Sequence, residues 1–135
     1  MPKKYLWVVM VVLVASLALT ACGGSGSAGS TSITTTMTDF HFEPTTWTVP
    51  AGKEIILKLV NNGSVEHDWV LLQKPVTPPA EQNSSNELFS AQANAGETKT
   101  VTFTAPSAPG EYEVICTIPG HLEAGMSGKL VVVQP

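Results

Sequence analysis

Apolar and polar residues alternate along much of this chain with a period of two, which is the repeat of a strand rather than of a helix. Residues 98–104 read TKTVTFT, which places Val101 and Phe103 on one face and threonines on the other. Residues 111–116 (EYEVIC) repeat this pattern. Each such strand must bury its apolar face against another layer, so we expect the chain to fold into packed β-sheets.

Two further segments are almost continuously apolar, residues 54–60 (EIILKLV) and 129–133 (KLVVV). Strands of this composition are covered on both faces or packed in a sandwich. Turn-forming residues separate the strand-like segments, at 50–52, 61–63, 95–96 and 106–110. Short strands at this spacing, without a strongly amphipathic helix, favour an all-β antiparallel sandwich.

Residues 74–93 (KPVTPPAEQNSSNELFSAQA) depart from this alternation. The segment is polar and is interrupted by prolines, which cannot donate a backbone hydrogen bond to a sheet. We therefore expect a long loop, with a helical turn around residues 86–91.

The first 21 residues have the composition of a secretion signal. Lys3 and Lys4 precede the apolar run YLWVVMVVLVASLAL, which is short for a membrane-spanning helix. The LTAC sequence that ends at Cys22 resembles the lipobox of bacterial lipoproteins. This resemblance implies cleavage before Cys22 and a diacylglycerol on its sulfur. The alternatives are an uncleaved signal anchor, or cleavage elsewhere that leaves Cys22 free.

The composition changes again after Cys22. Residues 23–32 (GGSGSAGSTS) have almost no side chain that could pack in a core, which is typical of a flexible tether. The predicted organisation is a signal peptide over residues 1–21, a lipidated cysteine and tether over residues 22–32, and one folded domain over residues 33–135. A lipid on Cys22 would hold this domain on the extracytoplasmic face of the cytoplasmic membrane, in the periplasm or at the cell surface.

Without residues 1–21 the chain has five lysines, no arginine and eleven acidic residues, and its formal net charge is −6 rather than −4. This acidic balance argues against binding to nucleic acid, which requires a basic face. If Cys22 is acylated, Cys116 is the only thiol left, and a single cysteine cannot form an internal disulfide. In an oxidising compartment Cys116 therefore needs another function.

The sequence CTIPGHLEAGM indicates what this function is, because it places Cys116, His121 and Met126 five residues apart. A thiolate, an imidazole and a thioether suit copper better than magnesium or calcium. A fourth ligand must come from elsewhere, and His67 is the best candidate because it follows a turn at the start of a predicted strand. Two histidines, one cysteine and an axial methionine are the ligands of a blue copper electron-transfer site.

The other ring-bearing residues near these positions have structural explanations. His41 lies between two phenylalanines on an alternating strand, so its side chain should point to solvent rather than to a metal. Trp47 and Trp69 are expected to lie in the core.

Residues 33–135, which contain all four of these ligands, resemble a cupredoxin of the auracyanin and azurin type. The matching segments are CTIPGHLEAGM with the GKL that follows it at 128–130, FEP at 42–44, VPAG at 49–52, and NN at 61–62 before His67. The resemblance implies a Greek-key β-sandwich with one mononuclear type 1 copper ion. It also assigns the metal ligands as His67, Cys116, His121 and Met126.

The residue after the first histidine is commonly Asn in cupredoxins, but here it is Asp68. The resemblance implies that this side chain accepts a hydrogen bond from Thr117, which an aspartate can still do. The added negative charge should favour Cu(II) and lower the reduction potential. Azurins also have a glycine before the first histidine, where this chain has Glu66, so we expect no fifth ligand.

The resemblance further implies a monomeric electron carrier rather than an enzyme. Pro119, Gly120 and Leu122 are small or apolar neighbours of His121, which suits a transient docking surface for a redox protein. The implied partners are a quinol-oxidising complex, a cytochrome, and a reaction centre or terminal oxidase.

Two other classes of function compete with electron transfer. One is a lipoprotein that binds and delivers copper, although such proteins usually use exposed methionines and histidines rather than a cysteine at the end of a strand. The other is a copper enzyme or a dinuclear copper A domain. The latter needs two cysteines in the loop, and multicopper enzymes need more histidines than the three present.

Overall fold

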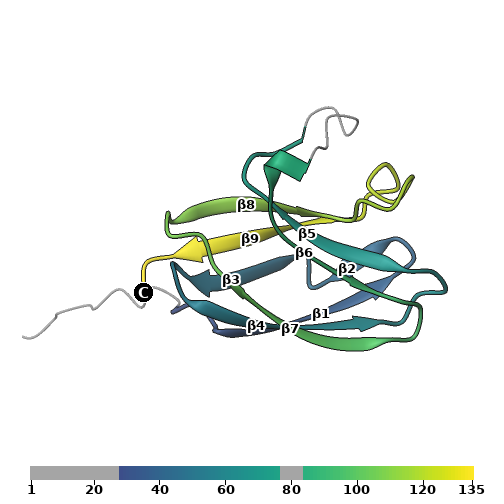
Figure 1. The fold of residues 1–135 in the computed structure, drawn as a ribbon, viewed down its shortest axis with the longest axis horizontal. Helices are drawn as coiled ribbons and strands as arrows, with labels where there is room; N and C mark the ends of the chain where they lie inside the picture. Colours follow the sequence, from purple (N-terminus) through teal and green to yellow (C-terminus); the bar gives the residue numbers. More distant parts are fainter. Residues whose placement is uncertain (1–27, 77–83) are drawn as a thin grey trace, which may run out of the picture.

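In the computed structural model, which describes residues 28–76 and 84–135, the chain folds into two β-sheets that pack face to face (Figure 1). One sheet has the order β2-β1-β4-β7 and contains β1 (Ser32–Thr38), β2 (His41–Glu43), β4 (Glu54–Asn61) and β7 (Thr98–Thr104). The other has the order β3-β9-β8-β5-β6 and contains β3 (Thr46–Pro50), β5 (His67–Leu72), β6 (Glu87–Ala93), β8 (Gly110–Ile115) and β9 (Ser127–Val133). The predicted all-β sandwich is confirmed.

Both sheets are mixed rather than purely antiparallel. β1 pairs in parallel with β4, and β3 pairs in parallel with β9, whereas the other pairs are antiparallel. The chain changes sheet between β2 and β3. The alternation in the sequence could not indicate these parallel pairs, because side chains alternate with the same period in parallel and antiparallel strands.

The apolar run in β4 is covered on one face only. Ile55, Leu57 and Leu59 are fully buried between the sheets, while Ile56 is 46% exposed. In β7 the expected inward residue Phe103 is buried and Val101 packs against the core. Each fully buried side chain of this size contributes about 1.5–3 kcal/mol relative to an exposed one, so these inward faces hold the sandwich together.

Aromatic side chains form the centre of the core. Trp47 and Trp69 are buried, as expected, with ring centroids 5.5 Å apart. The Trp69 ring also lies 5.6 Å from that of Phe103, and Phe42 lies 6.0 Å from Trp47, both measured between centroids. Because Trp69 lies two residues after His67 in β5, this core supports the strand that carries the predicted metal ligand.

The prediction of a loop over residues 74–93 is wrong for its second half. A 3₁₀ turn, η2 (Ser84–Asn86), leads into strand β6, which pairs antiparallel with β5 at the edge of its sheet. Phe89, Ala91 and Ala93 face the core at a period of two. Two of these inward residues are alanines, so the strand signal was weak beside the neighbouring prolines and serines.

The N-terminal features predicted from sequence lie largely outside the described residues, namely the signal peptide over residues 1–21 and Cys22. From the described part of the expected tether, the Ser30 N–H donates to the carbonyl of Thr48, at 2.9 Å, and the carbonyl of Thr31 accepts from Ile56, at 2.8 Å. β1 begins at Ser32. Within the described ranges, no helix has the length and apolar character needed to cross a membrane.

Candidate metal centre

One loop between two paired strands carries three of the predicted ligands. β8 ends at Ile115, Cys116 follows directly, and β9 begins one residue after Met126. The loop closes on itself, since the Cys116 N–H donates to the carbonyl of Met126 at 3.1 Å and the Met126 N–H donates to that of His121 at 3.0 Å. Figure 1 shows this loop (yellow-green) at the end of the sandwich opposite the C-terminus.

The fourth predicted ligand reaches the same place from another strand. His67 is the first residue of β5, and the neighbouring strand β8 leads directly to Cys116. The imidazole Nδ1 atoms of His67 and His121 are 3.1 Å apart, and Nδ1 of His121 is 3.4 Å from Sγ of Cys116. The three donor atoms all lie within 4.8 Å of one another. The fold therefore gathers residues that are far apart in the sequence.

Burial isolates this cluster from water. His67, Cys116 and Met126 have no exposed surface, and His121 is 7% exposed. Unpaired polar side chains are costly in such a place unless they bind one another or a metal. The Met126 side chain is buried as the expected axial ligand would be, and its backbone joins it to Cys116 and His121.

The spacing of the donors fits a bound metal ion. In zinc sites, imidazole nitrogen lies about 2.0–2.1 Å and thiolate sulfur about 2.3 Å from the ion, so donors that share an ion of this size lie roughly 3–4 Å apart. The separations of 3.1 and 3.4 Å between these donors fall in this range. Two imidazoles, one thiolate and a thioether form the donor set of a blue copper site, so the residues present fit copper.

The protonation states of the free site follow from burial. Burial raises the pKa of the Cys116 thiol from 9.0 to about 12, although backbone N–H groups of Asp68 and Ile118 act in the opposite direction. Burial also lowers the pKa of His121, and the neighbouring His67 lowers it further. A metal ion would therefore meet a neutral imidazole at His121 and would have to displace a proton from Cys116.

Asp68 and Thr117 make the contact that the resemblance implied. The Thr117 backbone N–H donates to Oδ1 of Asp68 at 2.6 Å, and the Thr117 hydroxyl donates to Oδ2 of the same carboxylate. Asp68 follows His67 and Thr117 follows Cys116, so this pair joins the two chain segments that carry the ligands. The carboxylate thereby fixes β5 to the loop of residues 116–126, which we call the cysteine loop.

Two further residues at the site were not predicted from sequence. Asp39 and Phe40 lie in the turn between β1 and β2, in the opposite sheet from the ligands. Oδ1 of Asp39 is 2.9 Å from Nε2 of His67, and the Phe40 ring lies 4.6 Å from the His121 ring between centroids. Hydrogen bonds from Ser64, followed by one from His67, hold the pKa of Asp39 at about 2. These contacts join segments that are far apart in the sequence, so only the folded structure shows them.

The residues predicted for partner docking differ in exposure. Pro119 and Gly120 are exposed, whereas Leu122 is half-buried against a small cluster of Val70, Leu72 and Ile115. Phe40, which sequence reasoning did not consider for docking, is 43% exposed beside His121. His41 points to solvent, as expected, with its Nε2 3.5 Å from a carboxylate oxygen of Glu43.

A β-sandwich of two mixed sheets that gathers one cysteine and two histidines at one end defines a cupredoxin, the class of small proteins with a blue copper site. Comparison with known proteins specifies the family. The model for copper-binding proteins of the plastocyanin/azurin family matches residues 29–133. The chain therefore belongs to the plastocyanin/azurin family.

Individual relatives agree with this assignment. Auracyanin-B of Chloroflexus aurantiacus is 39% identical over 110 residues, which cover 67% of this chain and 46% of that protein. The copper-resistant cuproprotein CopI of Rubrivivax gelatinosus is 32% identical over 111 residues, which cover 75% of this chain and 66% of that protein. The chain thus spans less than two thirds of the length of either relative.

A solved auracyanin structure matches this fold over nearly the whole length of the auracyanin chain. Dithionite-reduced auracyanin from the photosynthetic bacterium Roseiflexus castenholzii superposes with a TM-score of 0.68 at 26% sequence identity. The match covers 78% of this chain and 99% of that structure. The copper-binding sandwich is therefore the part that this chain shares with the auracyanins.

Proposed function

We propose that this protein is a membrane-tethered electron carrier whose type 1 copper is bound by His67, Cys116, His121 and Met126. The proposal rests above all on the convergence of two imidazole Nδ1 atoms and one cysteine Sγ within 4.8 Å in a buried site. Bound copper supplies one-electron chemistry by alternating between Cu(I) and Cu(II). The protein contributes the arrangement of the donors, a route for the electron and a surface for its partners.

The protein holds its donors in a fixed arrangement. Hydrogen bonds join Cys116 to Met126 and Met126 to His121 through the backbone, and the Asp68 carboxylate joins the segment after His67 to that after Cys116. None of these contacts involves a metal-binding atom. A site that is already built needs little rearrangement when its charge changes by one, and electron transfer then meets a low barrier.

The route for the electron passes through His121. Its ring lies at the loop end of the sandwich, under the half-exposed Phe40 and next to the exposed Pro119 and Gly120. These residues offer a small apolar surface for a redox partner, with the exposed Glu123 in the same loop. Leu122 borders this surface from its half-buried position. Such transient redox complexes bury small areas, which suits a carrier that must dissociate quickly.

The tether enters the domain at the end away from this surface. β1 begins at Ser32 and runs to the turn that places Asp39 and Phe40 over the two histidines. Seven residues of strand span about 20 Å. A lipid on Cys22 would therefore hold the far end of the domain near the membrane and leave the His121 end free. Tethering raises the effective concentration of the carrier near membrane-bound partners.

The proposed partners are a quinol-oxidising complex or cytochrome as donor, and a reaction centre or terminal oxidase as acceptor. The protein would act as a monomer on the extracytoplasmic side of the membrane and would catalyse no reaction of its own. Its similarity to auracyanins supports the carrier, whereas the name of its relative CopI, a copper-resistant cuproprotein, favours copper binding and delivery as a second candidate function.

Voltammetry of the copper-loaded protein separates the two functions. A carrier should give a reversible one-electron couple and should keep its copper through repeated cycles in the presence of a competing chelator. A delivery protein should lose its copper on reduction. The tether is tested in cells, where Cys22→Ser should move the protein from the membrane fraction to the soluble fraction. Copper loss in each cycle, or a Cys22→Ser variant that stays with the membrane, would contradict the corresponding part of the proposal.

A further inference from the structure

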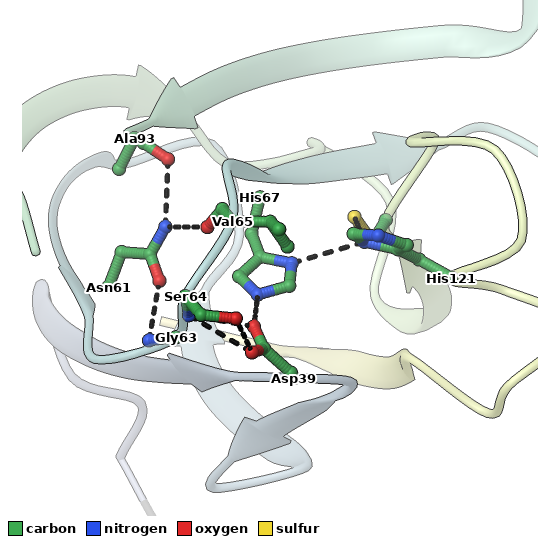
Figure 2. Close-up of polar contacts among 9 residues, drawn as sticks. Asp39, Asn61, Gly63, Ser64, Val65, His67, Ala93 and His121 are labelled. Atoms are coloured by element: carbon green, nitrogen blue, oxygen red, sulfur yellow. Dashed lines mark hydrogen bonds and ion pairs between the residues drawn. The ribbon is translucent and has the colours of Figure 1, made fainter. Parts of the chain in front are cut away.

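The proposed ligand His67 has a carboxylate partner on its outer side. Asp39, in the turn between β1 and β2, places Oδ1 2.9 Å from Nε2 of the buried imidazole. Figure 2 shows the ring between this carboxylate on one side and His121 on the other. The two ring nitrogens of His67 therefore face different partners, Nε2 towards Asp39 and Nδ1 towards His121.

Asp39 is itself held firmly. The Ser64 backbone N–H donates to both carboxylate oxygens, at 3.1 Å to Oδ1 and 3.0 Å to Oδ2, and the Ser64 hydroxyl donates to Oδ2. Ser64 lies in the turn that leads into β5, only three residues before His67. The carboxylate thus connects the β1–β2 turn of one sheet to the segment that delivers the histidine in the other.

Asn61 holds the segment that carries Ser64, as Figure 2 also shows. The buried Asn61 amide donates to the carbonyls of Val65 and Ala93, at 2.9 and 3.0 Å, and its oxygen accepts from the Gly63 N–H at 2.9 Å. Every hydrogen-bonding group of this side chain except one lone pair is used, two bonds holding the turn itself and one anchoring it to the end of β6. The position of the Asp39 carboxylate relative to His67 is therefore set by the fold.

The hydrogen bond determines which nitrogen of His67 carries the proton. A carboxylate can only accept, so Nε2 must donate, and a neutral imidazole has a single N–H. Nδ1, which lies 3.1 Å from Nδ1 of His121 in the donor cluster, then keeps its lone pair. Metal-binding histidines commonly bond through their other ring nitrogen in this way, which fixes both the tautomer and the orientation of the ring.

We propose that Asp39 is the positioning residue of the copper site, which orients His67 and holds its proton on Nε2 so that Nδ1 is free to bind the metal. This inference rests on the proposed ligand role of His67. It assigns a function to Asp39, which lies in the turn of the opposite sheet. The hydrogen bonds from Ser64 to Asp39 could stabilise this turn even if there were no metal site. The competing explanation is that Asp39 only stabilises that turn.

Two variants of the full chain separate these explanations. Asp39→Ala removes the acceptor, so NMR of the metal-free protein labelled with ¹⁵N should show His67 as a mixture of tautomers rather than as the Nε2–H form alone. Affinity for Cu(II), measured by chelator competition, should fall by about 10–100-fold. Asp39→Asn keeps an oxygen that can accept from Nε2, and it should preserve the tautomer while showing a smaller loss of affinity and a higher reduction potential.

Glu43→Ala is the matched control. It removes the same charge from an exposed carboxylate that faces another histidine, the exposed His41, rather than His67. Its Cu(II) affinity and reduction potential should equal those of the unchanged protein. If Asp39→Ala fails to fold, the potential and affinity of Asp39→Asn carry the test against this control.

The proposal is overturned if the unchanged protein binds copper and Asp39→Ala binds it equally well with His67 still in the Nε2–H form. It is also overturned if Asp39→Asn matches Glu43→Ala in both potential and affinity. Failure of the proposed ligand set looks different, because the unchanged protein would then give no blue copper complex at all, and failure of the carrier function would appear as copper loss during voltammetry. The tautomer of His67 in the metal-free protein tests the role of Asp39 even in that case.

Discussion

At the scale of single residues, the site is defined by where each donor atom is buried and what holds it. Cys116 is fully buried next to His121, and burial keeps its thiol protonated in the free protein. His67 and His121 direct their Nδ1 atoms towards each other, because Asp39 contacts the outer nitrogen of one ring and Phe40 lies against the other ring. Each donor is therefore held in place by a different contact, and Cys116 must also lose a proton before it binds a metal.

The raised pKa of Cys116 predicts that metal binding displaces one proton. The thiol has a pKa of about 12 in the fold, so it is protonated at pH 7, whereas a metal-bound cysteine is a thiolate. Affinity for Zn²⁺, a redox-inert ion that also binds cysteine and histidine, should rise about tenfold per pH unit between pH 7 and pH 9. Calorimetry in buffers of different ionisation enthalpy should find about one proton released, and Cys116→Ser should release none.

The same pKa has the opposite consequence for the metal-free fold. Because the folded value lies above the ordinary value of 9.0, the neutral thiol stabilises the fold below pH 9, and this contribution is lost as the pH rises towards 12. Metal affinity thus increases over a range in which the metal-free protein does not yet lose stability. A metal affinity that is independent of pH between 7 and 9 would contradict the assignment of Cys116 as a ligand.

Some site residues could be predicted from the sequence and others could not. The difference is whether a residue is recognisable from its neighbours in the sequence or only from its contacts in the fold. Cys116, His121 and Met126 are close in sequence, and their spacing alone indicates a metal site. His67 could be inferred because the site lacked a donor. Asp39 and Phe40 gave no such signal, because they belong to the opposite sheet and reach the histidines only through the packing of the two sheets.

At the scale of elements, turns rather than strands shape the site. The alternation of apolar residues predicted the strands and the sandwich, but it could not show that two strand pairs are parallel or that β6 replaces part of a predicted loop. Those features depend on pairing between distant segments and on inward alanines with little hydrophobic signal. In the sequence, the turn residues before β5 indicate only that one strand ends and another begins. In the structure, this turn holds the Asp39 carboxylate against His67.

Gly63 in this turn is predicted to be essential for the contact between Asp39 and His67. A Cβ at this position would lie 2.3 Å from Oδ1 of Asp39 and 2.7 Å from Nε2 of His67, closer than real contacts allow. In Gly63→Ala the new methyl group should force the Asp39 carboxylate away from the ring despite its hydrogen bonds to Ser64, and Cu(II) affinity should fall by about 10–100-fold, as expected for the loss of an outer hydrogen bond. Chelator competition measures the change.

Asn62→Ala provides the control for this turn. Asn62 is exposed and its backbone N–H donates to the carbonyl of Met37, at 2.8 Å, a bond that the substitution keeps. We expect its copper affinity to match that of the unchanged protein. A folded Gly63→Ala variant that binds copper as tightly as Asn62→Ala would show that the close packing around Asp39 does not matter to the site.

At the scale of the whole molecule, the sandwich separates its two ends. The cysteine loop lies at one end, and the C-terminus lies at the other (Figure 1). β1 leads from Ser32 to the turn over the histidines, so the chain that enters the domain also begins far from the site. This arrangement suits a carrier that is anchored through one end and exchanges electrons through the other, as we propose for this member of the plastocyanin/azurin family.

The optical spectrum of the purified protein after addition of Cu(II) tests the central claim most directly. A copper ion bound by the Cys116 thiolate between two imidazoles should give an intense blue charge-transfer band, with one copper per chain. The band should vanish in Cys116→Ser, which removes the sulfur but changes the volume of the side chain little. A colourless copper complex, or a blue band that persists in Cys116→Ser, would contradict the assignment of a type 1 copper site.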